Sequence, residues 1–377
     1  MELTGSHVFP RARALCYLDT AAEGLPFPGC EAAVAEYFHD KSLGTPGRSR
    51  MHEAEREARC LAARMLGAAM EDVALISSAT EGLNLLAHSI PWRAGDEVVL
   101  SDLEFPSNVL PWLCLRDRGV RVRLVPSRNG AVTLEQFAEA ITPATRLVTV
   151  SLVSYKSGAR IPFLAALADE AHRARAWLAV DATQALGRVP VAVAGIDYLV
   201  ASSYKWLLAP HGLGVVYLSP ELRGQLVPGT VGWYSVTDIF TADRFSSFEC
   251  KPGAEMLVCG MPNFPGIYAV GACLRYLNEI GPARIDRALG PLMHRLREEL
   301  CRLGVDLLTP PGLEYASGIV SFAHPAAAEI GAALERQGVV VWAGDGRVRA
   351  SVHLYNREDD IDRYLAVLGP ILESLRA

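Results

Sequence analysis

The sequence lacks an apolar run long enough to cross a membrane, which takes about 20 residues as a helix. It also lacks a basic excess, because 36 Lys and Arg against 42 Asp and Glu give a formal net charge of −6. Residues Met1 to Ser6 show no basic start followed by an apolar block, so no signal peptide is predicted. We therefore expect a cytoplasmic protein with no nucleic acid and no membrane among its partners.

Paired metal-binding spacings are also missing. The nine histidines form no HExxH-like cluster, so no metal site is predicted. The eight cysteines are scattered, which indicates reduced thiols in a cytoplasmic protein. They are Cys16, Cys30, Cys60, Cys114, Cys250, Cys259, Cys273 and Cys301.

What the chain does contain is a regular alternation of short apolar strands and helices. With 377 residues it is long enough for two domains. The alternation predicts an α/β fold: a mostly parallel seven-stranded sheet with helices on both faces, plus a smaller α+β C-terminal domain. The strands are expected at 73–77, 97–100, 122–125, 147–151, 177–180, 198–201 and 215–218.

The domain division follows the same pattern. Residues 1–45 are expected to form an N-terminal arm belonging to the small domain, residues 46–280 the large domain, and residues 281–377 the small domain. A helix at 282–303 would bridge the two domains, and the strands of the small domain are expected at 319–322, 339–342 and 348–352.

Lys205 carries the strongest chemical signal. An apolar strand ends in Ser202 and Ser203, and the lysine follows between Tyr204 and Trp206. Shielding from water lowers the pKa of an ammonium, and a neutral amine can bind a carbonyl cofactor such as pyridoxal 5′-phosphate (PLP) covalently. The alternative is an ordinary surface lysine on a loop.

Asp181 ends another buried strand, residues 177–180. The carboxyl ends of neighbouring parallel strands form the usual ligand edge of an open α/β sheet, so Asp181 and Lys205 are expected to meet there. A buried carboxylate can bind a protonated pyridine nitrogen, and Gln184 could donate to the ring oxygen. The alternative for Asp181 is a helix N-cap.

A third segment has the character of a phosphate site. Ser78, Ala79 and Thr80 follow the strand at 73–77 and open a helix. The N–H groups and dipole of a helix N-terminus attract anions, and Thr80 adds a hydroxyl. The same residues also make an ordinary capping arrangement.

Taken in order, these three segments resemble fold-type I PLP enzymes of the class V aminotransferase family, which includes cysteine desulfurases, selenocysteine lyases and isopenicillin N epimerase. The resemblance runs from the segment Tyr17–Ala22 to the segment Arg349–Asn356. It implies PLP as the cofactor and a homodimer as the assembly. The residues that it implies at the cofactor are Lys205 as the covalent link, Asp181 at the pyridinium, Gln184 at the ring hydroxyl, Thr80, Ser202 and Tyr204 at the phosphate, and Ala79 beside them.

The resemblance also implies residues at the ring and the substrate. Phe105 lies where the family places an aromatic residue that stacks on the ring, usually histidine in desulfurases; a phenyl ring can stack but cannot move protons. The alternative for Phe105 is core packing. Arg349 resembles the arginine that holds the substrate carboxylate, although Arg347 would share its strand face. Tyr155 occupies a substrate position where desulfurases usually have asparagine.

Two departures from the family pattern bear on the reaction. Desulfurases carry a reactive cysteine shortly before the arginine, whereas residues 339–348 contain none. Met261 lies where relatives often place a threonine that reaches the partner subunit's phosphate. The aromatic segment 229–255 often lines the partner's pocket in this family, and the alternative is a loop packed on its own chain.

The sequence therefore predicts a PLP-dependent enzyme acting at Cα or Cβ of a small amino-acid substrate. Because desulfurase-like sites weaken the Cα–H and Cβ–S bonds, we favour C–S β-elimination from a cysteine conjugate. Aminotransferase and amino-acid epimerase activities stay open as alternatives. A non-catalytic PLP-fold binding module is the alternative of another class, and the presence of both Lys205 and Asp181 counts against it.

Overall fold

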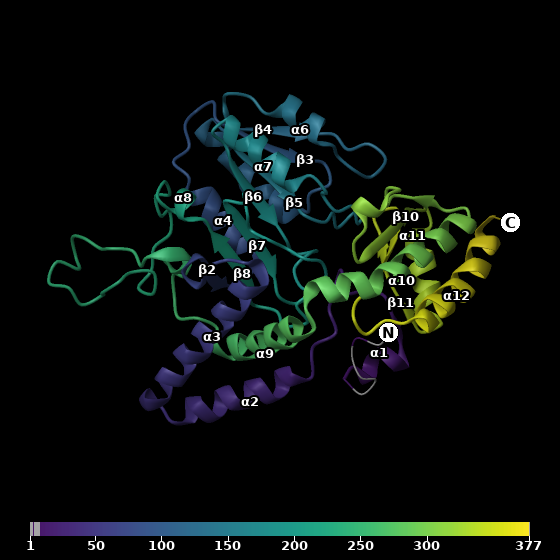
Figure 1. The fold of residues 1–377 in the computed structure, drawn as a ribbon, viewed down its shortest axis with the longest axis horizontal. Coiled ribbons are helices and arrows are strands. Elements are labelled where there is room, and N and C mark those ends of the chain that lie inside the picture. Colours follow the sequence, from purple (N-terminus) through teal and green to yellow (C-terminus); the bar gives the residue numbers. More distant parts are fainter. Residues whose placement is uncertain (1–2, 4–7, 377) are drawn as a thin grey trace.

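Figure 1 shows the computed structural model of the chain, which describes residue 3 and residues 8–376. Most of the segment on which the signal-peptide interpretation was based, and the first part of the predicted N-terminal arm, lie outside the described residues. None of the helices in the described part of the chain is both long enough and apolar enough to cross a membrane.

The centre of the molecule is one seven-stranded sheet, as predicted. Its strand order is β2-β8-β7-β6-β5-β3-β4, and every neighbouring pair is parallel except the two pairs that include β8. The carboxyl ends of the other six strands therefore lie at one edge. The strands are β2 (Val73–Ile76), β3 (Glu97–Ser101), β4 (Arg121–Val125), β5 (Thr145–Ser151), β6 (Trp177–Asp181), β7 (Tyr198–Ser202) and β8 (Gly214–Leu218).

Both faces of this sheet are buried because helices cover each of them. Alternate residues of one strand join different cores: Leu199 packs in one core, whereas Tyr198 and Val200 pack in the other. The first core includes α3 (Arg48–Leu66), α7 (Leu164–Arg173) and α9 (Phe264–Ile280), and the second includes α4 (Ala79–Ser89). Burial on both faces explains why most of these strands are largely apolar, whereas the edge strand β4 is partly exposed and contains Arg121 and Arg123.

A second, antiparallel sheet forms the smaller unit, which lies to one side of the central sheet in Figure 1. Its order is β12-β13-β10-β9, and three long helices belong to the same part of the chain. The elements are β9 (Asp306–Leu307), β10 (Ile319–Ala323), β12 (Trp342–Gly344), β13 (Arg347–Ser351), α10 (Pro282–Arg302), α11 (Ala327–Arg336) and α12 (Glu358–Arg376). This combination confirms the predicted fold class.

The N-terminal arm contacts both units. β1 (Cys16–Tyr17) pairs in parallel with β11 (Val339–Val340), whereas α2 (Gly29–Ser42) packs against α3 and α9. The predicted single strand at 339–342 is wrong, because β11 joins β1 and β12 joins β13 in a different sheet. The division at residues 45 and 280 stays a prediction. The remaining short helices are α1 (Pro10–Ala14), α5 (Leu110–Leu113), α6 (Leu134–Ala140) and α8 (Pro220–Arg223).

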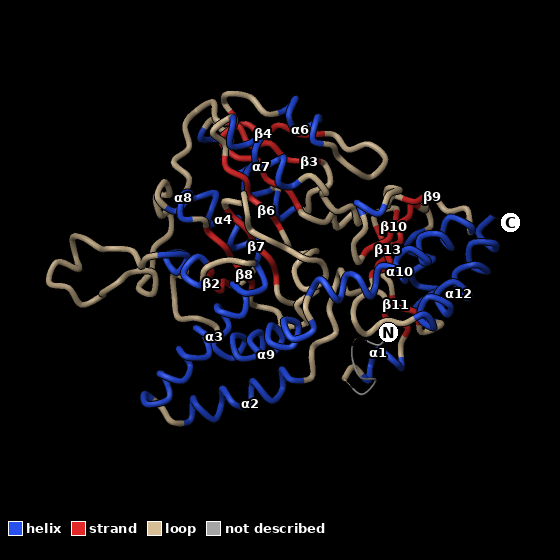
Figure 2. Tube along the Cα trace, in the orientation of Figure 1, coloured by secondary structure: helices blue, strands red, loops and turns tan. Residues whose placement is uncertain are grey.

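The aromatic loop, residues 229–255, projects from the body of the molecule between α8 and α9 (Figure 2). Phe240, Phe245 and Phe248 are exposed, Phe245 to 90%. The alternative in which this loop packs on its own chain is therefore wrong for these three rings. Such a group of exposed aromatic residues is typical of a surface that another molecule covers.

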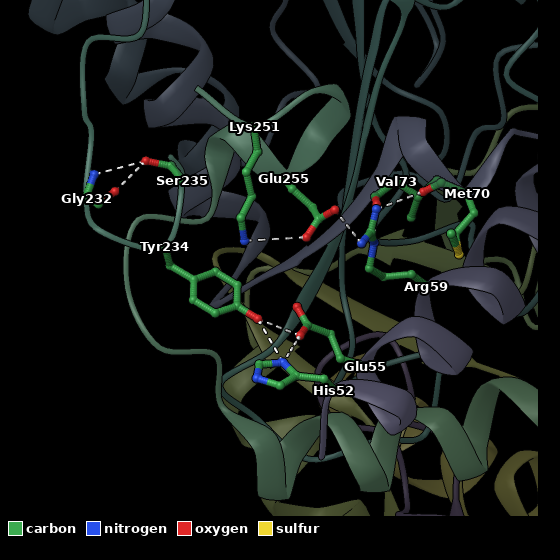
Figure 3. Close-up of polar contacts among 10 residues, drawn as sticks. All are labelled: His52, Glu55, Arg59, Met70, Val73, Gly232, Tyr234, Ser235, Lys251 and Glu255. Atoms are coloured by element: carbon green, nitrogen blue, oxygen red, sulfur yellow. Dashed lines mark hydrogen bonds and ion pairs between the residues drawn. The ribbon is translucent and has the colours of Figure 1, made fainter. Parts of the chain in front are cut away.

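Polar contacts with α3 fix the base of the aromatic loop (Figure 3). The Tyr234 hydroxyl donates to Glu55 of α3 at 2.7 Å, and the Lys251 ammonium lies 3.9 Å from the Tyr234 ring centroid. Glu255 forms an ion pair with the buried Arg59 at 2.8 Å. The base is thus bound to α3 while the aromatic tip extends beyond it.

Candidate active site

An open cavity with about 540 Å³ of space lies where the parallel strands β2, β5, β6 and β7 end. All the predicted cofactor residues line it, as does Tyr155, whereas Arg349 does not. The lining residues are Ala79, Thr80, Phe105, Ser107, Ser151, Val153, Tyr155, Asp181, Thr183, Gln184, Ser202, Tyr204 and Lys205. This position agrees with the rule that ligands of open α/β sheets bind beyond the carboxyl ends of the strands.

Lys205 follows the end of β7 and is buried, so the surface-lysine alternative is wrong. Its ammonium lies 5.4 Å from the Tyr204 ring centroid and 5.5 Å from that of Phe105. Burial, assisted by the positive charge of Arg349, lowers its pKa to about 8, against partial opposition from Asp181. A larger fraction of this lysine is therefore neutral at physiological pH than of an exposed one.

Asp181 is buried at the end of β6. The backbone N–H of Thr183 donates to its Oδ1 at 2.8 Å, and residues 182–187 form turns rather than a helix. The helix N-cap alternative is therefore wrong. Burial raises the pKa of Asp181, with hydrogen bonding from Thr183 opposing the rise. A cation bound at this carboxylate would stabilise its charged form.

The amide of Gln184 has a fixed orientation. The indole N–H of Trp206 can only donate, and it lies 2.6 Å from Gln184 Oε1. The Nε2 group therefore carries both amide hydrogens, of which one is donated to Ala21 O at 2.9 Å. The second amide hydrogen is left for a ligand in the cavity, which is compatible with the predicted donation to a ring oxygen.

The N-terminus of α4 forms the end of the cavity that is predicted to hold the phosphate. Ser78 caps the helix by accepting from Glu81 N, and Ser202 Oγ accepts from Ala79 N at 3.2 Å. The Thr80 hydroxyl lies 2.7 Å from Ser107 Oγ. Ser78 can cap the helix while the same N-terminus binds an anion, because the Thr80 N–H has no acceptor among the described residues and is free to donate to a ligand.

Tyr204 is held from outside the cavity by His211. The two rings are stacked with centroids 4.4 Å apart, and His211 Nε2 lies 3.0 Å from Glu23 Oε2 in the N-terminal arm. Burial raises the pKa of Tyr204, so its hydroxyl stays protonated and able to donate. No pattern in the sequence predicts this stack.

Phe105 lies on the cavity wall, so the core-packing alternative is wrong. Its side chain is 42% exposed, and its ring meets that of Tyr155 edge-on with centroids 5.0 Å apart. The neighbouring Glu104 is buried and accepts hydrogen bonds from Asn108 at 2.7 Å and Ser151 at 2.6 Å. Because these contacts attach the turn after β3 to β5, they fix the position of the Phe105 backbone.

Arg349 lies on β13, in the small unit, but is close enough to Lys205 to lower the pKa of the lysine. Its Nη1 donates to Tyr155 O at 3.0 Å, and its Nη2 lies 3.7 Å from Asp19 Oδ1. Burial lowers the pKa of Arg349 to about 10 and raises that of Asp19 to about 6. Arg347 shares the strand face, as the spacing predicts, but it is Arg349 whose charge lowers the pKa of Lys205 most after burial.

The segment before Arg349 is a tight hairpin. β12 ends at Gly344 and β13 begins at Arg347, so only Asp345 and Gly346 form the turn. The described part of the cavity wall contains no cysteine, and Met261 does not line it either. No group of three or more metal-ligating side chains occurs among the described residues.

Several residues of the site were missed by sequence reasoning. Ser107, Thr183 and Val153 line the cavity, and Asp19 lies beside Arg349. Ser107 lies in the same segment as Phe105 and could have been found there. No pattern could place Asp19 beside an arginine so distant in the chain.

The residues present fit PLP. The lining of one cavity offers a buried lysine, a buried carboxylate, a free amide hydrogen and a helix N-terminus with hydroxyls. These groups suit, in order, a carbonyl carbon, a pyridinium nitrogen, a phenolic oxygen and a phosphate.

Comparison with known proteins gives consistent results. Residues 16–364 match the family model Aminotransferase class-V. A probable cysteine desulfurase of Methanothermobacter thermautotrophicus is 30% identical, and the match covers 97% of this chain and 96% of that protein.

Two solved structures illustrate the match in fold. The apo structure of the cysteine desulfurase from Thermococcus onnurineus superposes with a TM-score of 0.90 at 26% identity, covering 98% of this chain and 97% of the other. The cystine C–S lyase C-DES, solved with its reaction product cysteine persulfide, has a TM-score of 0.87 at 22% identity, with 96% and 99% covered, and shows a shared fold. The predicted resemblance is thereby confirmed: the chain belongs to the class V aminotransferase family of PLP-dependent enzymes.

Proposed function

We propose that this enzyme is a PLP-dependent C–S lyase that eliminates the sulfur substituent from Cβ of a cysteine conjugate. The observation that carries the proposal is the tight hairpin before Arg349, together with a cavity wall that has no thiol among its described residues. Two of the relatives named above are cysteine desulfurases, and an enzyme of their kind that lacks an acceptor cysteine would release sulfur rather than retain it.

The cofactor has one function in this proposal. When bound, PLP supplies an electron-withdrawing ring that weakens the bonds at the substrate Cα. Lys205, Asp181, Gln184, Thr80, Ser202, Tyr204 and the Ala79 segment are the residues that would hold it, with Phe105 against the ring.

Proton transfer then depends on Lys205. With a pKa of about 8, its amine can accept a proton from the substrate Cα near neutral pH. Phe105 cannot titrate, and burial raises the pKa values of Tyr204 and Asp181. Arg349 would orient the substrate by its α-carboxylate, with Tyr155 beside it.

The finer features of the assembly are also proposals. We infer a homodimer in which the aromatic loop packs against a second copy, because Phe240, Phe245 and Phe248 together form an exposed apolar group at its tip. The presence of free cysteines throughout the described chain supports a reducing, cytoplasmic environment.

Light scattering tests the dimer. The intact protein should have twice the mass of one chain, and Phe245→Ser should shift the population towards monomer, because a ring that is 90% exposed in one chain would lose its apolar contact. Leu313→Ser changes another exposed apolar residue outside the loop and should leave the mass unchanged. A monomer at all concentrations would refute the inference.

Selective labelling tests the state of Lys205. In protein freed of cofactor, the rate of acylation at this lysine should rise through a midpoint near pH 8, whereas an unperturbed lysine titrates at about 10.4. Arg349→Gln should move the midpoint upward, because a positive charge that lowers this pKa is removed. Mass spectrometry of the labelled peptide gives the rate. Borohydride treatment of the holoenzyme should fix the cofactor to the same peptide, and fixation at another lysine would contradict the assignment.

Asp181→Asn tests the carboxylate at the ring. The amide keeps the shape and the Thr183 contact but loses the negative charge, so turnover should fall by about two orders of magnitude or more. Asp117→Asn, a change at an exposed residue that does not line the cavity, serves as the control and should leave turnover unchanged. Wild-type turnover in the Asp181 variant would mean that this carboxylate has only a structural role.

Product analysis tests the reaction itself. With a cysteine conjugate, the enzyme should release pyruvate, ammonia and a free thiol or sulfide, and each of the eight single Cys→Ser variants should retain this chemistry if it folds. A keto acid that retains the sulfur substituent would identify an aminotransferase, and a D-amino acid an epimerase. Alanine together with a persulfide on one cysteine would identify the protein as a desulfurase and refute the proposal.

A further inference from the structure

A second buried arginine lies beside Arg349. Arg347 is 2% exposed and precedes Arg349 by two residues on β13, so the two side chains share a face. Both guanidinium groups lie against the Trp342 ring, at 4.4 Å and 5.2 Å from its centroid. The charge of Arg347 also lowers the pKa of Arg349, behind the larger effect of burial, so the two cations interact.

The carboxylates around this pair of cations neutralise it poorly. Asp345 accepts from Arg347 Nη1 at 2.6 Å, but it lies in the hairpin turn with a side chain that is 74% exposed. Asp19 lies 3.7 Å from Arg349, and burial raises its pKa to about 6. Solvent around the exposed Asp345 carboxylate weakens its interaction with the buried Arg347. Two buried guanidinium groups therefore face one buried carboxylate, Asp19, which lies beyond hydrogen-bond distance of Arg349.

Hydrogen-bond donors are also unused. Nε of Arg347 and Nε of Arg349 are both buried, and neither has an acceptor among the described residues. A buried charged donor without an acceptor is costly, and native proteins rarely leave one unless a ligand or water supplies the acceptor. Two such groups on adjacent side chains of one face indicate a place built for acidic ligand groups.

Tyr155 connects this place to the reaction cavity. The Arg347 guanidinium lies 5.0 Å from the centroid of the Tyr155 ring, and Arg349 donates to the carbonyl of the same residue. The other side of the connection is the edge-on contact between Tyr155 and Phe105, both of which line the cavity with Lys205. Arg347 is thus one side chain beyond the wall of the cavity.

We propose that Arg347 binds a second acidic group of the substrate, located on the substituent that leaves with the sulfur. The substrate class is a cysteine conjugate whose sulfur carries a carboxylate or sulfonate, with Arg349 holding the α-carboxylate and Arg347 the distal acid. This inference rests on the proposed C–S lyase function. The Cα proton is removed, the Cβ–S bond breaks with its electron pair on sulfur, and hydrolysis by water yields pyruvate, ammonia and an acidic thiol.

A pair of substrates that differ only in charge tests the proposal. S-carboxymethyl-L-cysteine and S-carbamoylmethyl-L-cysteine have nearly the same shape, but only the first has a distal carboxylate. The wild-type enzyme should favour the acid over the amide by roughly tenfold to a hundredfold in kcat/KM, the effect of one hydrogen bond to a charged group. The Kd ratio of the two compounds, measured by calorimetry in the Lys205→Ala variant, should show the same preference without turnover.

Two substitutions assign the preference to Arg347. Arg347→Gln should bring the acid-to-amide ratio to within about twofold of one, whereas Arg302→Gln, which removes an exposed arginine of α10, should keep the wild-type ratio. Asp345→Asn should raise the ratio, because the competing carboxylate is removed. This variant should fold normally, since Asp345 has a φ of 49° and asparagine tolerates that conformation.

The outcomes separate this inference from the proposed function. A ratio near one in the wild-type enzyme, or a ratio that Arg347→Gln and Asp345→Asn both leave unchanged, would refute the role of Arg347 even if both conjugates are cleaved. A charge preference in Kd without any cleavage would support the acid site and refute the C–S lyase proposal instead.

Discussion

The burial of the Lys205 amine is the constraint on which the rest of this site depends. Charged amines are rarely buried without a close carboxylate, and the described residues place none within ion-pair distance of Lys205. The N-terminal arm packs closely on the backbone of this segment: Gly24 N donates to Tyr204 O at 2.9 Å, and a Cβ on Gly24 would lie 1.9 Å from Lys205 O. The arm must therefore have glycine at this position in order to lie against the lysine backbone.

Charged groups at different places around Lys205 act on its pKa in opposite directions, and none of those described forms an ion pair with it. Asp181 favours the protonated amine from one side, and Arg349 disfavours it from another, with burial as the larger effect. Because Arg349 comes from the small unit, the pKa of the lysine depends on how the small unit is positioned against the central sheet. A substrate carboxylate at Arg349 would cancel part of that positive charge, so substrate binding and the basicity of the lysine are coupled.

The fold was predictable from the sequence because its signals are local. The strands of the central sheet other than the edge strand β4 are buried on both faces and therefore read as largely apolar runs. The carboxyl ends of the parallel strands bring Thr80, Asp181 and Lys205 together without further information. The predictions that are wrong depend on contacts between distant parts of the chain. The run at 339–342 divides between two sheets, because Val339 and Val340 pair with the distant β1. Asp19 beside Arg349 arises in the same way, through an arm that returns across the whole chain.

The short hairpin between β12 and β13 bears both on where the sulfur goes after elimination and on which substrates the site accepts. A turn of two residues leaves no room for a loop that could carry a thiol to the cavity, and it places Asp345 directly against Arg347. The same short turn thus leaves no place for a sulfur acceptor and holds a second buried guanidinium beside the first, and in the described part of the chain the ion-pair partner of that guanidinium is the exposed Asp345. Two buried like charges destabilise each other unless acidic groups lie close by. An acidic leaving group would supply this compensation while the sulfur is still attached, and the thiol it forms would leave because no covalent link to the protein retains it.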